Sequence, residues 1–312
     1  MEHRRAVRAP EHRKAEGAAA VTSLFTSPED VRTRLSAGNY LADGHIATTV
    51  FLADALGKPL LVEGPAGVGK TELAKAVAAA TGADLIRLQC YEGLDEGRAL
   101  YEWNYRKQLL RIQATPEGQD WSDTHDDIFS DEFLLARPLL TAIRRTEPTV
   151  LLIDETDKTD VEVEGLLLEV LSDFQVTIPE LGTVTAARRP FVVLTSNATR
   201  ELSEALKRRC LYLHLDYPAP EREREIVLAQ VPGITEALAE QLVRTIATLR
   251  ALDLKKSPSI AETLDWARTL LALQSDALDE EAIARTLGVV LKHASDQDRA
   301  AKELGLPTAG LD

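Results

Sequence analysis

The chain has 312 residues, 45% of them apolar and 28% charged, which is typical of a globular protein with one large domain or a large domain and a smaller companion. Its formal net charge of −14 disfavours nucleic acid as the main partner, because phosphates repel an acidic surface. No run approaches the roughly 20 consecutive apolar residues of a membrane span, and the basic segment 1–17 lacks the apolar core of a secretory signal. The two cysteines, Cys90 and Cys210, have no CxxC partner, so we expect reduced core residues in a cytoplasmic protein.

In the first two thirds of the chain, helical and strand patterns alternate. Helical periodicity over 29–38 and 46–56 comes first. Short apolar runs, which we expect to be strands, follow at 59–63, 84–89, 149–153, 191–195 and 211–215. Helices are expected between them at 71–81, 133–145, 160–173 and 203–209. The alternation predicts an α/β fold with a parallel five-stranded sheet covered on both faces, and the more alternating last run fits a sheet edge.

After the prolines of segment 216–220 the pattern becomes purely helical. Helices are expected at 221–231, 235–251, 259–273, 279–291 and 293–303. The chain therefore divides, on sequence alone, into a flexible tail (1–28), an α/β core (29–217) and an all-helical domain (218–312).

Two regions depart from this scheme. Residues 91–130 form an unusually long expected loop. The overlapping segment 117–132 has seven carboxylates and no Lys or Arg, but lacks EF-hand spacing, which favours a solvated loop over a metal site. Segment 174–190 reads as a β-hairpin.

The strongest chemical signal lies between the first expected strand and the helix after it. Its sequence matches the phosphate-loop pattern GxxxxGK(S/T), and the residues are Gly64, Pro65, Ala66, Gly67, Val68, Gly69, Lys70 and Thr71. Glycines allow backbone N–H groups to curl round a polyphosphate, and the helix N-terminus adds its dipole. Lys70 is expected to meet the β- and γ-phosphates, and the Thr71 hydroxyl is expected to bind Mg²⁺.

Polar residues end the neighbouring strands. Asp154 and Glu155 follow an apolar run, which places Asp154 where it can hold Mg²⁺ through water and Glu155 where it can act as general base. Asn197 ends the next strand and could orient the attacking water, although turn chemistry would also explain it. Arg208 and Arg209 end a helix, either compensating its dipole or reaching a neighbouring subunit's nucleotide.

Together these motifs resemble an AAA+ P-loop ATPase, with a fold of parallel sheet and C-terminal helical lid. The stretches KPLLVEGPAGVGKTELAKAVA, FLLARPLLTAIRRTEPTVLLIDETDKTD and LTSNATRELSEALKRRCLYLHLDYP are similar to the MoxR branch, as is a β-hairpin insert expected inside helix two. QCYEGLDEGRALYEWNYRKQLL and KKSPSIAETLDWARTLLAL resemble its CoxD group.

The resemblance implies a homo-oligomeric ring, a hexamer, that hydrolyses ATP with Mg²⁺ to remodel a protein client. The implied partner is a von Willebrand factor A-type (CoxE-like) protein, and the implied client is a molybdenum hydroxylase such as carbon monoxide dehydrogenase. The alternatives are a CbbQ/NorQ-like activator of another metabolic complex, a McrB-like nucleic-acid-stimulated motor, which the charge disfavours, and a scaffold that binds ATP without useful turnover.

The resemblance also assigns residues. It makes Gly64 to Thr71 Walker A, Asp154 and Glu155 Walker B, and Asn197 sensor 1. Arg209 is the first and Arg208 the second arginine-finger candidate, and Gly44 and His45 fall where such proteins hold adenine. MoxR-type lids commonly carry Ser-Pro-Arg, whereas this chain has Ser257-Pro-Ser259, so a sensor-2 arginine is missing. Either Lys255, Lys256 or Arg268 replaces it, or the lid is coupled more weakly to the nucleotide.

The aromatic residues near the second strand allow two interpretations, contact with a client or pore, or anchoring of the long segment to the core. They are Tyr91, Tyr101, Trp103 and Tyr105.

Overall fold

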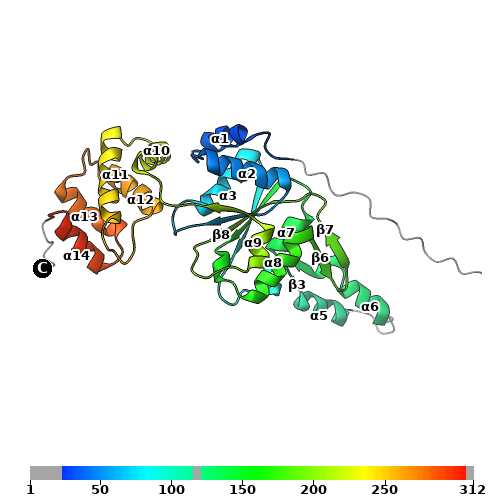
Figure 1. Cartoon of the computed structure of the whole chain (residues 1–312). Helices are drawn as coiled ribbons and strands as arrows, with labels where there is room; N and C mark the ends of the chain where they lie inside the picture. Colours follow the sequence, from blue (N-terminus) through cyan, green and yellow to red (C-terminus); the bar gives the residue numbers. More distant parts are fainter. Residues whose placement is uncertain (1–22, 115–120, 307–312) are drawn as a thin grey trace, which may run out of the picture.

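The computed structural model describes residues 23–114 and 121–306, which form an α/β lobe and a helical lobe (Figure 1). The α/β lobe contains a five-stranded parallel sheet in the order β2-β5-β8-β1-β9. Its strands are β1 (Leu60–Glu63), β2 (Asp84–Gln89), β5 (Thr149–Asp154), β8 (Phe191–Ser196) and β9 (Leu211–His214). The predicted sheet is therefore confirmed, and the most strongly alternating run, β9, lies at an edge.

Alternate side chains of the central strands enter two different hydrophobic layers. Leu60 and Val62 pack on one face with α1 (Pro28–Ala37), α2 (Gly44–Leu56) and α3 (Lys70–Thr81). Leu61 and its neighbours on the other face pack with α7 (Pro138–Arg144), α8 (Val161–Asp173) and α9 (Glu204–Arg209). Figure 1 shows these two helical layers above and below the sheet. The central strands are buried on both sides, which explains their continuous apolar sequence.

The prediction of a long loop over 91–130 is wrong, because most of the described part of this region has regular secondary structure. Its described elements are α4 (Glu96–Ala99), β3 (Tyr101–Trp103), α5 (Tyr105–Ala114), α6 (Trp121–Ile128), the 3₁₀ turn Asp131–Phe133 and β4 (Leu134–Ala136). Residues 134–136 belong to β4, which pairs antiparallel with β3, and not to the helix expected from 133. That helix begins instead at Pro138. Proline suits this first helical position because it has no N–H to leave unpaired.

The predicted hairpin forms from β6 (Gln175–Ile178) and β7 (Gly182–Thr185), which pair antiparallel. Its predicted position inside helix two is wrong, since it lies between α8 and β8. The helical segment after the second sheet strand is interrupted instead by β3 and β4, which separate α4 from α7. Figure 1 shows α5 and α6, carried by this insertion, at the end of the molecule far from the helical lobe.

The N-terminal segment is packed from residue 23 onward, although the whole of 1–28 was expected to be a tail. The buried Asp54 carboxylate accepts hydrogen bonds from the Ser23 hydroxyl (2.6 Å) and from the N–H groups of Leu24 (2.7 Å) and Phe25 (3.0 Å). Phe25 is only 1% exposed. Residues 1–22 lie outside the described part of the chain.

The second lobe consists of helices around their own hydrophobic core, in which Trp266 is fully buried. They are α10 (Pro220–Gln230), α11 (Glu236–Arg250), α12 (Ile260–Ala272), α13 (Glu280–Val290) and α14 (Ala294–Glu303). Across the described residues, no helix is both long and apolar enough to cross a membrane.

Candidate nucleotide site

The glycine-rich loop runs from β1 to α3, and its backbone leaves no room for side chains at two positions. A Cβ on Gly64 would collide with the backbone carbonyl of Leu215, just beyond β9. Gly67 has a φ of 76°, a left-handed conformation that favours glycine, and a Cβ there would collide with the Ser259 side chain. Since α3 begins at Lys70, the free N–H groups of its first turn face the loop.

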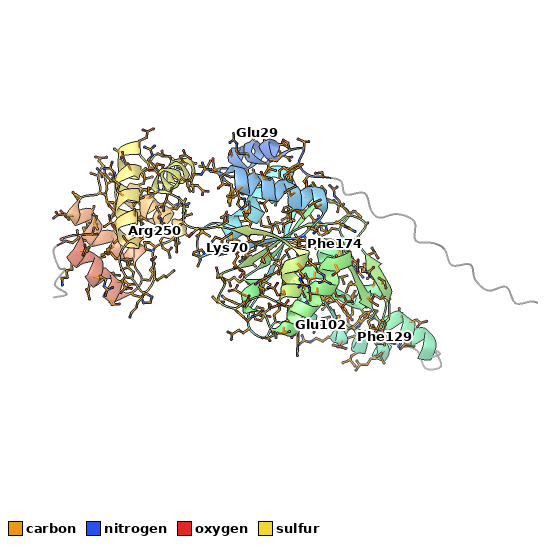
Figure 2. The ribbon with its side chains drawn as sticks, viewed as in Figure 1. Glu29, Lys70, Glu102, Phe129, Phe174 and Arg250 are labelled. Atoms are coloured by element: carbon orange, nitrogen blue, oxygen red, sulfur yellow. The ribbon has the colours of Figure 1, made fainter. Side chains whose placement is uncertain are left out.

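The Lys70 ammonium is held by oxygens of the loop and of the neighbouring strand. Its Nζ donates to the carbonyls of Gly64 (2.6 Å) and Pro65 (2.7 Å) and to Oδ1 of Asn197 (2.8 Å). Burial lowers the pKa of Lys70, and nearby carboxylates, first that of Asp157, partly oppose this effect. Figure 2 places Lys70 at the side of the α/β lobe that faces the helical lobe.

Asp154 and Thr71, the two predicted magnesium residues, lie side by side. The Thr71 hydroxyl donates to Oδ1 of Asp154 (3.0 Å), which also accepts from the Thr195 hydroxyl (2.5 Å). Oδ2 of Asp154 accepts from the Arg87 guanidinium at 2.5 Å. A carboxylate and a hydroxyl beside a phosphate loop are oxygen ligands of the kind that Mg²⁺ prefers, so the residues present fit the metal.

Glu155 follows Asp154 at the edge of the sheet, in a left-handed conformation with a φ of 58°. Its N–H donates to the Thr195 hydroxyl at 2.9 Å, which fixes the backbone. Its carboxylate accepts from Nε2 of Gln89 (2.9 Å) and from Nζ of Lys158 (2.7 Å). Glu155 therefore lines the same cavity as the phosphate loop, but its carboxylate is engaged by two donors.

Asp157 holds the loop that carries Asn197, a role that sequence reasoning missed. Its buried carboxylate accepts from the N–H groups of Asn197 and Thr199, both at 3.1 Å, and from the Thr199 hydroxyl at 2.5 Å. Burial alone would raise the pKa of Asp157, but these hydrogen bonds outweigh it and hold the pKa below its ordinary value of 3.8. The available signal was a third acid close behind the Asp154–Glu155 pair.

These groups open into a cavity of about 730 Å³ between the two lobes. Its walls include Ala66 to Thr71, Asp154, Glu155, Asn197 and His45. Apolar and aromatic side chains also line it, among them Tyr40, Tyr217, Ile226, Ile260 and Leu264. Gly44 is the first residue of α2 and is not among the lining residues. The volume lies within the usual range for small-molecule and cofactor sites.

Ser259, at the position where the MoxR resemblance predicts an arginine, contacts the phosphate loop by packing on Gly67. The N–H of Ala261 donates to the Gly67 carbonyl at 3.3 Å, so the first turn of α12 lies directly on the loop. Glu262 completes a capping box with Ser259, whose N–H it accepts at 3.0 Å. A helix cap therefore occupies the place expected for a charged residue.

Among the described residues, the lining of this cavity includes only one basic residue of the helical lobe, Arg222 on α10. Lys256 pairs with Glu262 (3.0 Å) and Arg268 pairs with Asp265 (3.0 Å), and neither lines the cavity. Lys255 is also absent from the lining. Arg222 itself forms an ion pair with Glu225, one turn later on the same helix.

Arg208 and Arg209 lie outside the cavity of their own chain. Both are exposed at the end of α9. Nε of Arg209 donates to the Ser172 hydroxyl (2.6 Å), and its NH1 donates to the Ala205 carbonyl (3.1 Å). The fold thus brings the loop, Asp154, Glu155 and Asn197 together but leaves these two arginines apart from them.

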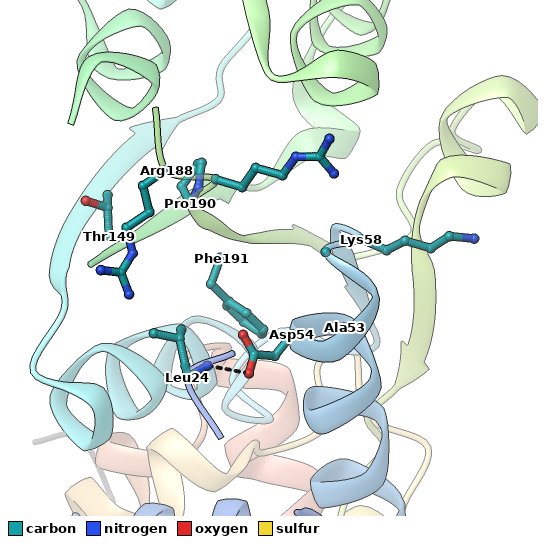
Figure 3. A pocket seen from close by; sticks show the side chains of 10 residues that line it. Leu24, Ala53, Asp54, Lys58, Thr149, Arg188, Pro190 and Phe191 are labelled. Atoms are coloured by element: carbon teal, nitrogen blue, oxygen red, sulfur yellow. Dashed lines mark hydrogen bonds between the residues drawn. The ribbon is translucent and has the colours of Figure 1, made fainter. Parts of the chain in front are cut away.

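A second, much smaller cavity of about 30 Å³ lies at the opposite, amino edge of the sheet (Figure 3). Thr149 and Phe191, the first residues of β5 and β8, line it together with Asp54 and Leu24. Figure 3 shows the hydrogen bond from Leu24 to Asp54 beside this space. A space of this size has room for little more than a water molecule, so the large cavity is the better candidate site.

Comparison with known proteins gives one family match and several relatives. Residues 59–210 match the family model of the AAA domain (dynein-related subfamily). The chain is 29% identical over 243 residues to protein SH1500 of Staphylococcus haemolyticus, covering 74% of this chain and 84% of that protein. It is 31% identical over 195 residues to the chaperone protein ClpB of Corynebacterium glutamicum, covering 56% of this chain but only 20% of ClpB.

Among solved structures, the Thermotoga maritima RuvB Holliday junction branch migration motor aligns with 91% of this chain and 83% of its own, at 19% identity and a TM-score of 0.46. The family match covers the phosphate loop, the acidic strand end, Asn197 and the arginine-bearing helix. The chain has the AAA+ P-loop fold, with the subfamily match confined to residues 59–210, and is an ATP hydrolase that uses ATP with Mg²⁺.

Proposed function

We propose that this ATPase is of the MoxR type and uses ATP hydrolysis to remodel a protein client, in the manner of the CoxD group. The observation that carries the proposal is the convergence of Lys70, Asp154, Glu155 and Asn197 on one cavity roofed by the helical lobe. A site built from both lobes can convert the loss of a phosphate into relative movement of the lobes. The proposed moving units are the core, residues 29–217, and the lid, residues 218–312.

Each site residue has a proposed part in hydrolysis. Lys70 and the N–H groups at the start of α3 bind the terminal phosphates, and Thr71 and Asp154 hold Mg²⁺, Asp154 through water. Bound Mg²⁺ would neutralise charge on the phosphate oxygens. Glu155 takes the proton from the attacking water, which Asn197 orients. To do so, the Glu155 carboxylate must leave Lys158, its partner at 2.7 Å.

The nucleotide base is proposed to lie against the apolar lining residues near His45 and Gly44. Burial raises the pKa of Tyr40, which therefore stays a neutral phenol in this wall. Arg222 is the proposed lid contact for the nucleotide, in place of the arginine that Ser259 replaces, because it is the basic lid residue that lines the cavity.

The proposed assembly is a hexameric ring of this chain, in which Arg209, with Arg208 as second candidate, reaches the nucleotide of the neighbouring subunit. The exposed positions of both arginines support this arrangement. The proposed partner is a von Willebrand factor A-type protein, and the proposed client is a molybdenum hydroxylase. Similarity of the quoted sequence stretches supports both. Free, buried Cys90 and Cys210 suit the proposed cytoplasmic location.

The test is a pull-down from the native host with Glu155→Gln, loaded with ATP, followed by mass spectrometry. Lys70→Ala, which should not retain nucleotide, is the matched control for ATP-independent binding. Recovery of a von Willebrand-type protein with molybdenum hydroxylase subunits on Glu155→Gln alone supports the proposal. Recovery of another metabolic enzyme would instead support the role of a CbbQ/NorQ-like activator. Recovery of nucleic-acid enzymes would contradict the maturation role.

A further inference from the structure

Arg87 forms an ion pair with the proposed magnesium carboxylate from outside the nucleotide cavity. It lies on β2, one of the two edge strands, which pairs with β5 in parallel register. Its guanidinium donates to Oδ2 of Asp154 at 2.5 Å and also contacts Gln89. Asp154 lines the cavity and Arg87 does not, so the guanidinium approaches the carboxylate from the side of the sheet edge.

The two partners differ greatly in exposure. The Asp154 side chain is 3% exposed, whereas that of Arg87 is 49% exposed. Glu164 and Arg200 make a comparable pair, but there the arginine also donates to the Thr159 carbonyl at 2.7 Å, which ties it to the backbone. Within the described part of the chain, the acceptors of Arg87 are the side chains of Gln89 and Asp154. It can therefore rotate into solvent without leaving a buried backbone group unpaired.

A cation beside Asp154 lowers the affinity of the carboxylate for a metal ion. Oδ1 is already engaged by Thr195 and Thr71, and Oδ2 is engaged by Arg87. Mg²⁺ on the cavity side must either share this carboxylate with a fixed positive charge or displace it. In both cases Coulomb repulsion or the lost ion pair weakens metal binding.

We propose that Arg87 competes with Mg²⁺ for Asp154 and keeps the metal affinity of this site low, so that Mg²⁺ is held firmly only while a triphosphate also ligates it. The proposal rests on Asp154 being a magnesium residue of the proposed function. Its consequence is that Mg²⁺ leaves readily once only ADP remains. Arg87 thus acts through Asp154 as a positioning residue and takes no part in bond breaking.

The test measures Mn²⁺ binding to the full chain saturated with ADP, by the electron paramagnetic resonance signal of free Mn²⁺. Arg87→Gln removes the charge, and Arg87→Met is the second neutral variant if the first does not fold. Arg145→Gln is the matched control, because Arg145 pairs with Asp84 at the other end of the same strand. Stopped-flow release of a fluorescent ADP, with and without Mg²⁺, provides a second readout.

We expect the neutral variants to bind Mn²⁺ about tenfold more tightly than wild type and to release ADP more slowly in Mg²⁺. Arg87→Lys and Arg145→Gln should stay within about twofold of wild type. A folded Arg87→Gln with unchanged or weaker Mn²⁺ affinity overturns the proposal. If wild type fails to retain Mn²⁺ with any nucleotide, while Asp154→Asn behaves identically, the assignment of Asp154 itself fails.

Discussion

The buried ion pair between Glu223 and Arg250 should determine the stability of the lid where it meets the nucleotide cavity. Arg250 NH1 and NH2 donate to the Glu223 carboxylate at 2.5 and 2.9 Å, and the Thr263 hydroxyl donates to it at 2.7 Å. Arg250 also donates to the Pro258 carbonyl (2.8 Å) and lies over the Tyr217 ring, 4.7 Å from its centre. Figure 2 labels Arg250 within the helical lobe. One pair thereby joins α10, α11, α12 and the segment linking the lobes.

Glu223→Gln keeps the shape of the side chain and removes its charge. The Glu223 side chain is 1% exposed and that of Arg250 14%, so the variant leaves a buried guanidinium without its counter-ion. Breaking a buried pair from one side costs about 3–5 kcal/mol. We expect a loss of roughly 3 kcal/mol, the lower end, because Arg250 keeps Pro258 and Tyr217.

The assay is urea unfolding followed by the fluorescence of Trp266, which is fully buried in the lid core. Substituting Trp103 and Trp121 with Phe makes Trp266 the only tryptophan of the chain. The control is Glu221→Gln, an exposed change on the same helix, expected to stay within about 0.5 kcal/mol of its parent. A loss below about 1 kcal/mol for Glu223→Gln would refute the reasoning, since the pair would then contribute no more than a surface one.

Three further predictions concern the loop that carries Asn197, the lid residue in the cavity, and the pH dependence of stability. Asp157→Ala should lower kcat at least about tenfold with a smaller change in nucleotide affinity, because it releases the Asn197 loop, and steady-state kinetics beside equilibrium binding will separate the two effects. Arg222→Ala should weaken ATP binding by about tenfold while Arg224→Ala, on the same helix but outside the cavity lining, should not, as titration calorimetry can show. In the folded state, the pKa values of Asp157 and Glu164 lie below their ordinary values of 3.8 and 4.5. The stability that these two carboxylates contribute is therefore fully present above the ordinary pKa values, and it is lost as the pH falls through the folded-state pKa values. Urea midpoints that stay constant from neutral pH down to about pH 3 would contradict this assignment.

The sheet could be predicted because buried parallel strands are continuously apolar and short, and because the phosphate loop marks the end of one of them. The insertion between β2 and β5 could not. Leu109 and Leu110 of α5 are 60% and 67% exposed, so the apolar periodicity that identifies a helix is absent there. The strand β4 exists only because β3 pairs with it from a distance.

The site residues likewise include some that the sequence predicts and some that it does not. Lys70, Thr71, Asp154 and Glu155 could be assigned because they occur at fixed spacing within strand–loop–helix units. Arg87 could not, since its contact with Asp154 joins residues 67 positions apart and depends on the register of β2 against β5. The arrangement of the lid residues Ser259 and Arg222 likewise depends on how the two lobes pack.

The central claim is that this cavity hydrolyses ATP with Glu155 as the base, and single-turnover hydrolysis by purified Glu155→Gln tests it most directly. The nucleotide retained after incubation with Mg-ATP is separated from the protein and identified. We predict bound ATP that stays intact while wild type converts it to ADP, with ATP affinity in the variant close to that of wild type. Conversion by Glu155→Gln at the wild-type rate would contradict the account.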